Sequence, residues 1–175
     1  AVLYGGSSSE REISLQSGLG VHKAILELGF ESELIDYRNI KDLRELKNFD
    51  FVFNALHGFE GEGGKLQQNL DDLKILYSGS CPEACKNTWN KKFTKEILVR
   101  NKIRTPVSLD ITFSKQIVEN GLQANSFDRF RPFEYIFLKP EEDGSSVDIF
   151  KISDNKSLEE AFQKCTYPNR KFIFE

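Results

Sequence analysis

Short apolar runs punctuate the first half of the chain and predict strands. They lie at residues 1–4, 34–35, 51–56 and 75–77. The run at 51–56 is apolar at nearly every position, which is typical of a strand that is buried on both faces of a sheet. Gly5-Gly6 follow the first run and His57-Gly58 follow the third. Both predicted strands therefore end in turns.

Segments of helical period separate these runs. Val21, Ala24, Ile25 and Leu28 have the i, i+3, i+4, i+7 spacing of one helix face, and Gly29 stands where a C′ glycine ends a helix. Two further helices are predicted at 41–47 and 62–73, with inward-facing leucines at Leu43, Leu46, Leu66, Leu70 and Leu73. This alternation of strands and helices predicts an α/β fold, with a parallel, Rossmann-like sheet covered by helices on both sides.

The pattern of apolar and polar residues changes after Ser80, and the new pattern predicts a second unit of α+β type. Pro82 fits the first turn of a helix, and a lysine-rich helical stretch follows at 90–101. Two strands are predicted at 135–139 and 147–152, around a Gly144-Ser145-Ser146 turn, followed by a helix at 158–165 and a strand at 171–174. We place the domain boundary near residues 80–90 and divide the chain into 1–85 and 86–175.

Composition narrows the classes of partner. The 175 residues carry a net charge of −3, so no overall basic field favours nucleic acid or an anionic membrane. No apolar run approaches the roughly 18 residues that a membrane span needs, and the first residues do not resemble a signal peptide. Cys81, Cys85 and Cys165 show no pairing pattern. Free thiols in a reducing cytosol explain them better than a metal site does.

The first candidate site is the loop from Gly5 to Glu12. Glycines permit a tight turn after the strand, serines supply an N-cap, and the following helix N-terminus presents N–H groups that suit an anion. The loop lacks the G-x-G-x-x-G pattern of a dinucleotide site. A plain strand–turn–helix cap, with Glu10 placed favourably in the helix dipole, explains the same residues.

The second candidate site is the loop from His57 to Gly64. Four of its eight residues are glycines. Ligands of open α/β sheets bind beyond the carboxyl ends of the strands, where this loop and the first loop are both expected. A solvated turn with Glu62 as a helix cap remains an equal alternative.

The third candidate site runs from Lys139 to Asp148. A strand-end lysine followed by a Gly-Ser-Ser turn suits phosphate binding. Three successive acidic residues, 141–143, would repel a polyphosphate unless Mg²⁺ intervened. A polar hairpin tip is the alternative. Lys91, Lys92 and Lys95 could add a second phosphate contact, or form a solvated helix face.

Taken together, these loops resemble D-alanine–D-alanine ligases, which are ATP-grasp enzymes of peptidoglycan precursor synthesis. The resemblance spans the chain from end to end, because several motifs recur in the same order. They are V-L-Y-G-G-S-S-S-E-R-E-I-S-L-Q-S-G, F-N-A-L-H-G-F-E-G-E-G-G, Y-S-G-S, N-K-K-F-T-K, R-T-P and L-K-P-E-E-D-G-S-S-V.

The resemblance implies a reaction and a set of roles. ATP, with Mg²⁺, would phosphorylate the carboxylate of one D-alanine, and the amine of a second would attack the acylphosphate. Glu10 matches the glutamate that holds the first ammonium, and His57 matches the histidine near the first carboxylate. The other matched positions are Lys91 and Lys139 on the ATP phosphates, Ser145 in the hydrogen-bond network around the substrate, Ser146 in the phosphate loop, and Glu175 at the start of the adenine hinge.

The sequence also departs from the family pattern. Gly63 stands where the family usually has Asp, Asp148 where it usually has Gly, and Asn90 where Asp is common. The family's Mg²⁺ carboxylates and its phosphoryl-stabilising arginine lie beyond residue 175, so we expect an incomplete chain, truncated at the adenine hinge, that does not turn over by itself.

Several alternatives stay open. The second substrate could be D-lactate or D-serine. The chain could be a non-enzymatic binding module that retains the first half of a ligase, or part of a different ATP-grasp enzyme. A cytosolic location and a possible homodimer are further expectations.

Overall fold

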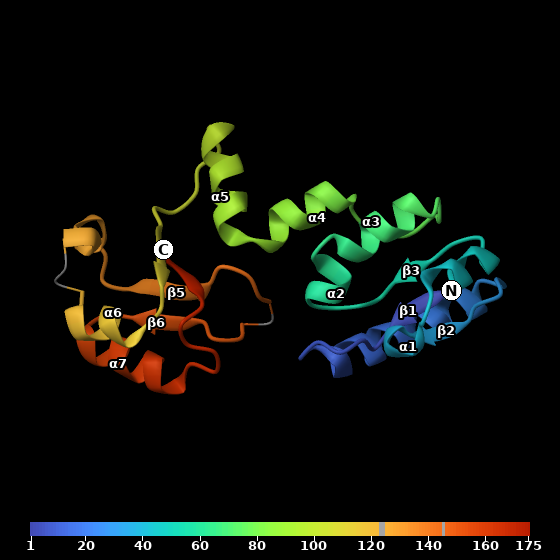
Figure 1. The fold of residues 1–175 in the computed structure, drawn as a ribbon, viewed down its shortest axis with the longest axis horizontal. Coiled ribbons are helices and arrows are strands. Elements are labelled where there is room, and N and C mark those ends of the chain that lie inside the picture. Colours follow the sequence, from blue (N-terminus) through green and yellow to red (C-terminus); the bar gives the residue numbers. More distant parts are fainter. Residues whose placement is uncertain (123–124, 145) are drawn as a thin grey trace. The chain divides into compact units, whose positions relative to one another are not determined.

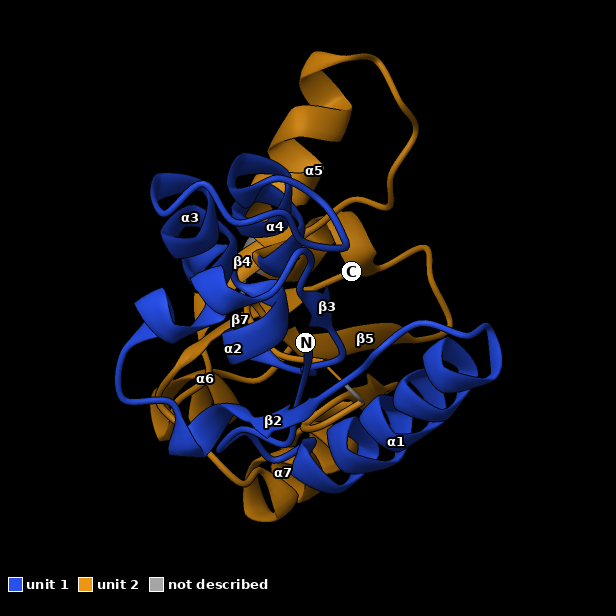
Figure 2. Ribbon diagram, turned by 90° about the vertical axis from the view of Figure 1, so that its right-hand side faces the viewer, with its two compact units in different colours: residues 1–89 blue, residues 90–175 orange. Residues whose placement is uncertain are grey.

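A computed structural model describes residues 1–122, 125–144 and 146–175 (Figure 1). The chain forms two compact units, Ala1–Trp89 and Asn90–Glu175 (Figure 2). Ser145, one of the predicted site residues, lies outside the described residues. Within the part of the chain that the structure describes, every helix is too short or too polar to cross a membrane.

A parallel sheet forms the centre of the first unit. Its strands are β1 (Val2–Tyr4), β2 (Leu34–Asp36) and β3 (Phe53–Asn54), in the order β2-β1-β3. β1 is parallel to both neighbours, and Val2 is in register with Leu34 and Phe53. The predicted parallel α/β arrangement is therefore confirmed.

Two of the predicted strands are shorter than their apolar runs. The run at 51–56 forms a regular strand only at Phe53–Asn54. The run at 75–77 joins the sheet through a single parallel bridge between Tyr77 and Val52. Burial also contradicts the prediction at the start of the run at 51–56, since Phe51 is exposed while Val52 is fully buried. The apolar runs thus predict correctly which segments join the sheet, but the paired strands are shorter than the runs.

Helix α1 (Arg11–Glu27) is confirmed, but its predicted buried face is wrong. Its buried residues are Ser14 and Gly18, whereas Leu28, just beyond its end, is 74% exposed. A Cβ added at Gly18 would lie 2.4 Å from Tyr4 Cβ. The helix packs through its small residues because they let its backbone come close to β1, and the bulky apolar residues are left outside.

Gly29 ends α1 as predicted. Its φ is +82°, a left-handed conformation that favours glycine. Its N–H donates to the Leu26 carbonyl, and the N–H of Phe30 donates to the Ile25 carbonyl. These two bonds form a Schellman motif, which satisfies carbonyls that the helix end leaves open.

The predicted helix at 62–73 is confirmed as α3 (Lys65–Asp72), which starts three residues later than predicted, and a short helix that was not predicted, α2 (Phe59–Glu62), precedes it. Gly64, with φ +87°, separates them. Leu66 and Leu70 are buried as predicted. The remaining elements of this unit are the 3₁₀ helices η1 (Tyr37–Asn39) and η2 (Leu43–Asn48) and helix α4 (Pro82–Trp89), which starts at the predicted proline.

The second unit is built on an antiparallel sheet. Its strands are β4 (Leu109–Thr112), β5 (Ile136–Pro140), β6 (Phe150–Ile152) and β7 (Lys171–Phe174), in the order β4-β7-β5-β6. The last strand in sequence lies between β4 and β5 and pairs with both. The predicted α+β character of this half is confirmed.

Helices complete the second unit. They are α5 (Lys91–Arg100), α6 (Lys115–Asn120), η3 (Asn125–Phe130) and α7 (Asn155–Lys164). The side chain of Asn90 caps α5 by accepting from the Phe93 N–H at 3.0 Å. Asp154 and Ser157 form a capping box at the start of α7, three residues earlier than predicted. Among the described residues, a phenylalanine-rich core lies under the sheet, with Phe113, Phe172 and Phe174 fully buried.

Candidate functional site

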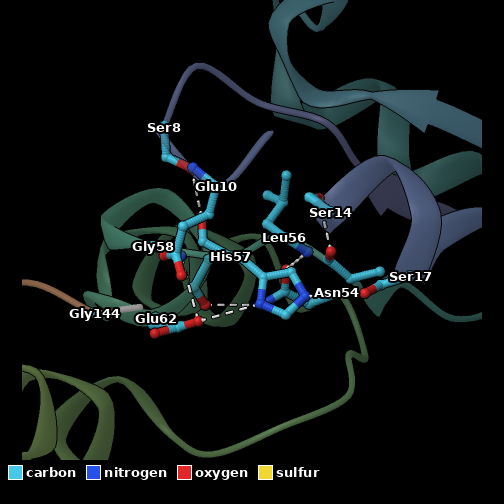
Figure 3. A network of polar contacts seen from close by, with 12 residues as sticks. Ser8, Glu10, Ser14, Ser17, Asn54, Leu56, His57, Gly58, Glu62 and Gly144 are labelled. Carbon is cyan, nitrogen blue, oxygen red and sulfur yellow. Dashed lines mark hydrogen bonds and ion pairs between the residues drawn. The ribbon is translucent and has the colours of Figure 1, made fainter. Parts of the chain in front are cut away.

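Two loops meet at one edge of the parallel sheet in the first unit. β1 runs into the loop 5–10, and β3 runs into the loop 55–58. The two strands are parallel neighbours, so their carboxyl ends lie at the same edge. The first and second loops predicted from the sequence are therefore brought together (Figure 3).

Serines of the first loop bind the second loop directly. Ser7 donates to Glu60 from its backbone N–H at 2.6 Å and from its hydroxyl at 2.8 Å. Ser8 Oγ donates to the His57 carbonyl at 3.0 Å. These serines fix the distance between the loops. They do not cap α1, whose N-cap is Glu10 and has no side-chain capping bond.

Glu10 lies beside the second loop. Its N–H donates to Ser8 Oγ at 3.2 Å. A Cβ at Gly58 would lie 3.0 Å from a carboxylate oxygen of Glu10. Gly58 also has φ +75°. A side chain at position 58 would be strained and would crowd the carboxylate, so this glycine is required by its conformation and by its neighbour.

His57 is held by two partners, one on α1 and one on α2 (Figure 3). Its Nε2 lies 3.1 Å from Ser17 Oγ on α1, and its Nδ1 lies 3.7 Å from Glu62 Oε1. The imidazole remains about one third exposed. Glu62 also accepts from the Gly58 N–H at 3.3 Å, so it supports the loop as well as the histidine. Glu10 and His57 thus present one carboxylate and one imidazole at the same sheet edge.

Arg11 and Asp36 tie the first loop to β2, which sequence patterns did not predict. The guanidinium donates to both carboxylate oxygens of Asp36, at 3.1 and 2.5 Å, and to the Gly6 carbonyl at 2.8 Å. This hydrogen bonding from Arg11 lowers the pKa of Asp36 to about 2. Such planar, bidentate pairs are among the stronger ones in proteins.

The Arg11–Asp36 pair predicts a loss of stability in acid. The folded-state pKa of about 2 is below the ordinary 3.8, so the ionised carboxylate stabilises the fold above about pH 4. That contribution, on the order of 2 kcal/mol, should be lost as the pH falls from 4 to 2. Urea unfolding of Asp36→Asn and wild type should differ at pH 6 and converge at pH 2.

Asp42 provides the matched control. It also begins a 3₁₀ helix and pairs with a nearby arginine, Arg44, but both side chains are well exposed. Asp42→Asn should change the free energy of unfolding little at any pH. An equal effect of the two substitutions would contradict the account of Asp36.

The second unit has a cluster of opposite charges at the end of β5. Lys139 Nζ donates to Glu175 Oε1 at 2.5 Å, and Lys95 Nζ donates to the other oxygen at 2.6 Å. Burial raises the pKa of Glu175, but the bonds from the two lysines outweigh it and lower that pKa overall. Lys139 and Glu175, two of the predicted ATP-binding residues, are therefore in direct contact.

Lys91, at the first turn of α5, lies beside the loop that follows β5. Its ammonium donates to the Asp143 carbonyl at 2.8 Å. The pKa of Lys91 is lowered, chiefly by burial; Lys139 and Arg170 lower it further, while Asp143 and Glu175 oppose the shift. Lys91 and Lys139 thus lie near each other in the second unit, and two neighbouring ammonium groups suit an anion such as phosphate.

The structure describes Gly144 and Ser146, the two ends of the phosphate loop predicted at 144–146. Ser146, with φ +60°, and Asp148, with φ +53°, have left-handed backbones. Ser145 lies outside the described residues. Two of the acidic residues that seemed to oppose phosphate binding already have partners. Glu142 accepts from Asn90, and Asp143 accepts from Arg170.

Sequence reasoning missed three residues that shape these sites. Lys95 was weighed as part of a solvated face, yet it is buried and binds Glu175 and Thr105. Glu60, although it lies in the second candidate loop, was given no role, and Arg170 lies outside the quoted motifs. Their partners lie 53 and 27 residues away in the chain, and no local pattern reveals such pairs. Across residues 1–122, 125–144 and 146–175, no cluster of metal-ligating side chains is present.

The fold and the sites are those of a two-unit α/β protein, with anion-suited loops beyond its strand ends. The chain is homologous to D-alanine–D-alanine ligases. It is 38% identical over 165 residues to the ligase of Bordetella petrii, covering 92% of this chain and 47% of the relative. It is 36% identical to the ligase of Francisella philomiragia, covering 94% of this chain and 52% of the relative. No family model matches the sequence.

Solved structures give the same result. The D-alanine–D-alanine ligase of Bacillus anthracis matches 99% of this chain with a TM-score of 0.81 and 28% identity. The same enzyme complexed with ATP matches with a TM-score of 0.80 and 25% identity. These matches cover 55% and 56% of the solved chains. The chain thus spans about half the length of the relatives it matches.

Proposed function

We propose that this chain supplies the first D-alanine site and part of the ATP site of a D-alanine–D-alanine ligase. The observation that carries the proposal is the homology over 92% of the chain. The two loops at the parallel sheet edge and the lysines near the end of β5 support it. The relatives are named as ligases, and they do not favour the alternative of a non-enzymatic binding module.

In the first unit, Glu10 and His57 are proposed to bind the first D-alanine. A carboxylate suits the ammonium of the amino acid. An imidazole beside backbone N–H groups suits its carboxylate. The contacts that join the loops keep both groups at one edge, which supports their action on one small molecule.

In the second unit, Lys91, Lys139 and Ser146 are proposed to bind ATP phosphates. Glu175 is proposed to lie where the adenine contacts begin, and Ser145 is proposed to join the substrate network. Acylphosphate formation brings a carboxylate to a triphosphate, so the site must supply positive charge and donors. The lysine cluster supplies that charge. Lys139 would exchange its contact with Glu175 for a phosphate contact, or share the two.

Magnesium does not fit the described residues of this chain. Of the three acidic residues after β5, Glu142 is engaged with Asn90 and Asp143 with Arg170. Burial is the main cause that raises the pKa of Glu141 above its ordinary value. We therefore assign no Mg²⁺ ligand here, and we infer that a complete enzyme takes its metal carboxylates from residues outside this chain.

The proposal also includes the cellular location, the partners and the oligomeric state of the protein. An ATP-dependent ligase for peptidoglycan precursors works in the cytosol, where its nucleotide is. The partners expected are D-alanine and ATP, with a homodimer as a further prediction that sedimentation of the purified protein would test. The 175 residues alone should not turn over.

Glu10→Gln tests the first-substrate site. In the full-length protein that carries this chain, the substitution should lower kcat/KM for D-alanine by about 100-fold, because it removes the counter-charge of the ammonium. The KM for ATP should change little. Glu12→Gln is the matched control, since Glu12 is exposed and lies on the first turn of the same helix. Equal effects of the two substitutions would refute the role of Glu10.

A further inference from the structure

Arg170 joins the two ends of the loop that follows β5. Its Nη1 donates to Asp143 Oδ2 and its Nη2 donates to Asp148 Oδ2, each at 2.8 Å. Asp143 and Asp148 flank the proposed phosphate loop, so one guanidinium holds both sides of it. Both hydrogen bonds are charge-assisted, and the planar fork of arginine fixes their geometry.

Asp148, one of the two carboxylates that Arg170 binds, is itself held in place by several contacts. Its side chain is only 2% exposed. Besides Arg170, it accepts from the backbone N–H of Thr166 at 2.8 Å and of Tyr167 at 3.3 Å. It has a left-handed backbone, φ +53°, in which aspartate is tolerated better than most residues. Glycine would be easiest at this position, but it would supply no carboxylate for Arg170.

The guanidinium also lies over two aromatic rings. Its central carbon lies 5.4 Å from the Tyr167 ring and 5.3 Å from the Phe172 ring. Phe172 is fully buried in β7. Arg170, which directly precedes β7, is therefore held beside one of the two inner strands of the sheet.

Asp143 links Arg170 to Lys91. Arg170 holds the carboxylate of Asp143, and the carbonyl of the same residue accepts from Lys91 Nζ at 2.8 Å. A shift of Asp143 would move the acceptor that orients the ammonium. The order of contact is Asp148, Arg170, Asp143 and then Lys91.

We propose that Arg170, fixed by Asp148, is a positioning residue for nucleotide phosphate binding. It holds the Asp143 carboxylate and, through the Asp143 carbonyl, sets the direction of the Lys91 ammonium. The inference rests on the proposed function, because it assumes that Lys91 binds phosphate. It goes beyond that function by assigning a role to Arg170 and Asp148, which lie outside the quoted motifs, and to Asp143, which had been given none.

Arg170→Met tests the proposal in the full-length protein. Methionine keeps much of the apolar contact with the two rings but makes no bond to either carboxylate. The KM for ATP should rise about tenfold, since small displacements of a binding group are costly. The KM for D-alanine should stay within about twofold of wild type. Arg131→Met is the control: Arg131 also pairs with an aspartate in this unit, but its side chain is 64% exposed.

A double-substitution cycle separates positioning from a general structural effect. If Arg170 acts through Lys91, Arg170→Met should raise the KM for ATP by less than about twofold in a Lys91→Met background. A full tenfold rise in that background would overturn the proposal. If Lys91→Met alone leaves ATP binding unchanged, the proposed function of Lys91 fails and the positioning role falls with it. If Lys91→Met weakens binding but Arg170→Met does not, only the positioning role fails.

Arg170→Lys covers the case in which Arg170→Met fails to fold. Lysine keeps the positive charge but cannot span two carboxylates as a planar fork. It should give a folded protein with a KM for ATP between those of wild type and Arg170→Met, or, where the latter is unfolded, about threefold above wild type. A wild-type KM for ATP in folded Arg170→Lys would contradict the need for a double contact.

Discussion

Lys139→Met should reduce the rate of ATP-dependent ligation by about 10²–10³-fold in the full-length protein. Lys139 lies at the end of β5, and its ammonium is proposed to neutralise charge on the phosphates. Its present partner, Glu175, shows that the ammonium is held at a fixed point and only about one quarter exposed. Removing a fixed charge from a site that must hold a triphosphate and a carboxylate leaves both less stabilised. Steady-state release of phosphate measures the effect.

Two further substitutions serve as controls for the effect of Lys139→Met. Lys151→Met, on the neighbouring strand β6, removes an exposed lysine that stacks on Tyr135, and it should leave the rate within about twofold of wild type. Lys95→Met also deprives Glu175 of a partner and should cost much less than Lys139→Met. If Lys95→Met were as damaging as Lys139→Met, the loss would come from Glu175 and not from a phosphate contact.

Phe113→Ala should destabilise the second unit by about 3–5 kcal/mol. Phe113 is fully buried and lies 5.4 Å from the Phe162 ring and 5.2 Å from the Phe172 ring. Its truncation would leave a cavity between the sheet and α7, because neighbouring rings in a packed core close such space only partly. Urea unfolding followed by circular dichroism measures the change.

Phe133→Ala is the matched control for the core. Phe133 lies in the same unit but is 57% exposed. Its truncation should cost less than about 1 kcal/mol. A cost below 1 kcal/mol for Phe113→Ala would mean that the phenylalanine cluster is not the core of this unit.

Hydrophobic pattern predicted the presence of most elements better than their packing. The period of α1 was read correctly, but its buried side was not, because Gly18 approaches Tyr4 and leaves Leu28 outside. A prediction based only on apolar side chains does not identify a buried helix face that consists of Ser14 and Gly18. The later start of α3, after Gly64, was signalled by Gly63 and Gly64, but the prediction began the helix before both glycines.

The candidate sites were predictable where local rules place them. Loops beyond parallel strand ends are brought together by topology alone, which is why the loops of Glu10 and His57 meet. Long-range charge pairs were not predictable. Arg11–Asp36 spans 25 residues, Lys95–Glu175 spans 80 and Asp148–Arg170 spans 22. Each depends on how strands are ordered in space, and a single sequence read locally does not contain that order.

The most direct test of the account is detection of D-alanyl-D-alanine. The full-length protein that carries this chain would be incubated with Mg²⁺, ATP and D-alanine, and the dipeptide and phosphate would be quantified by mass spectrometry and colorimetry. The account predicts equal amounts of dipeptide and phosphate, neither formed when ATP or D-alanine is omitted. Folded protein that forms no dipeptide under these conditions would contradict it.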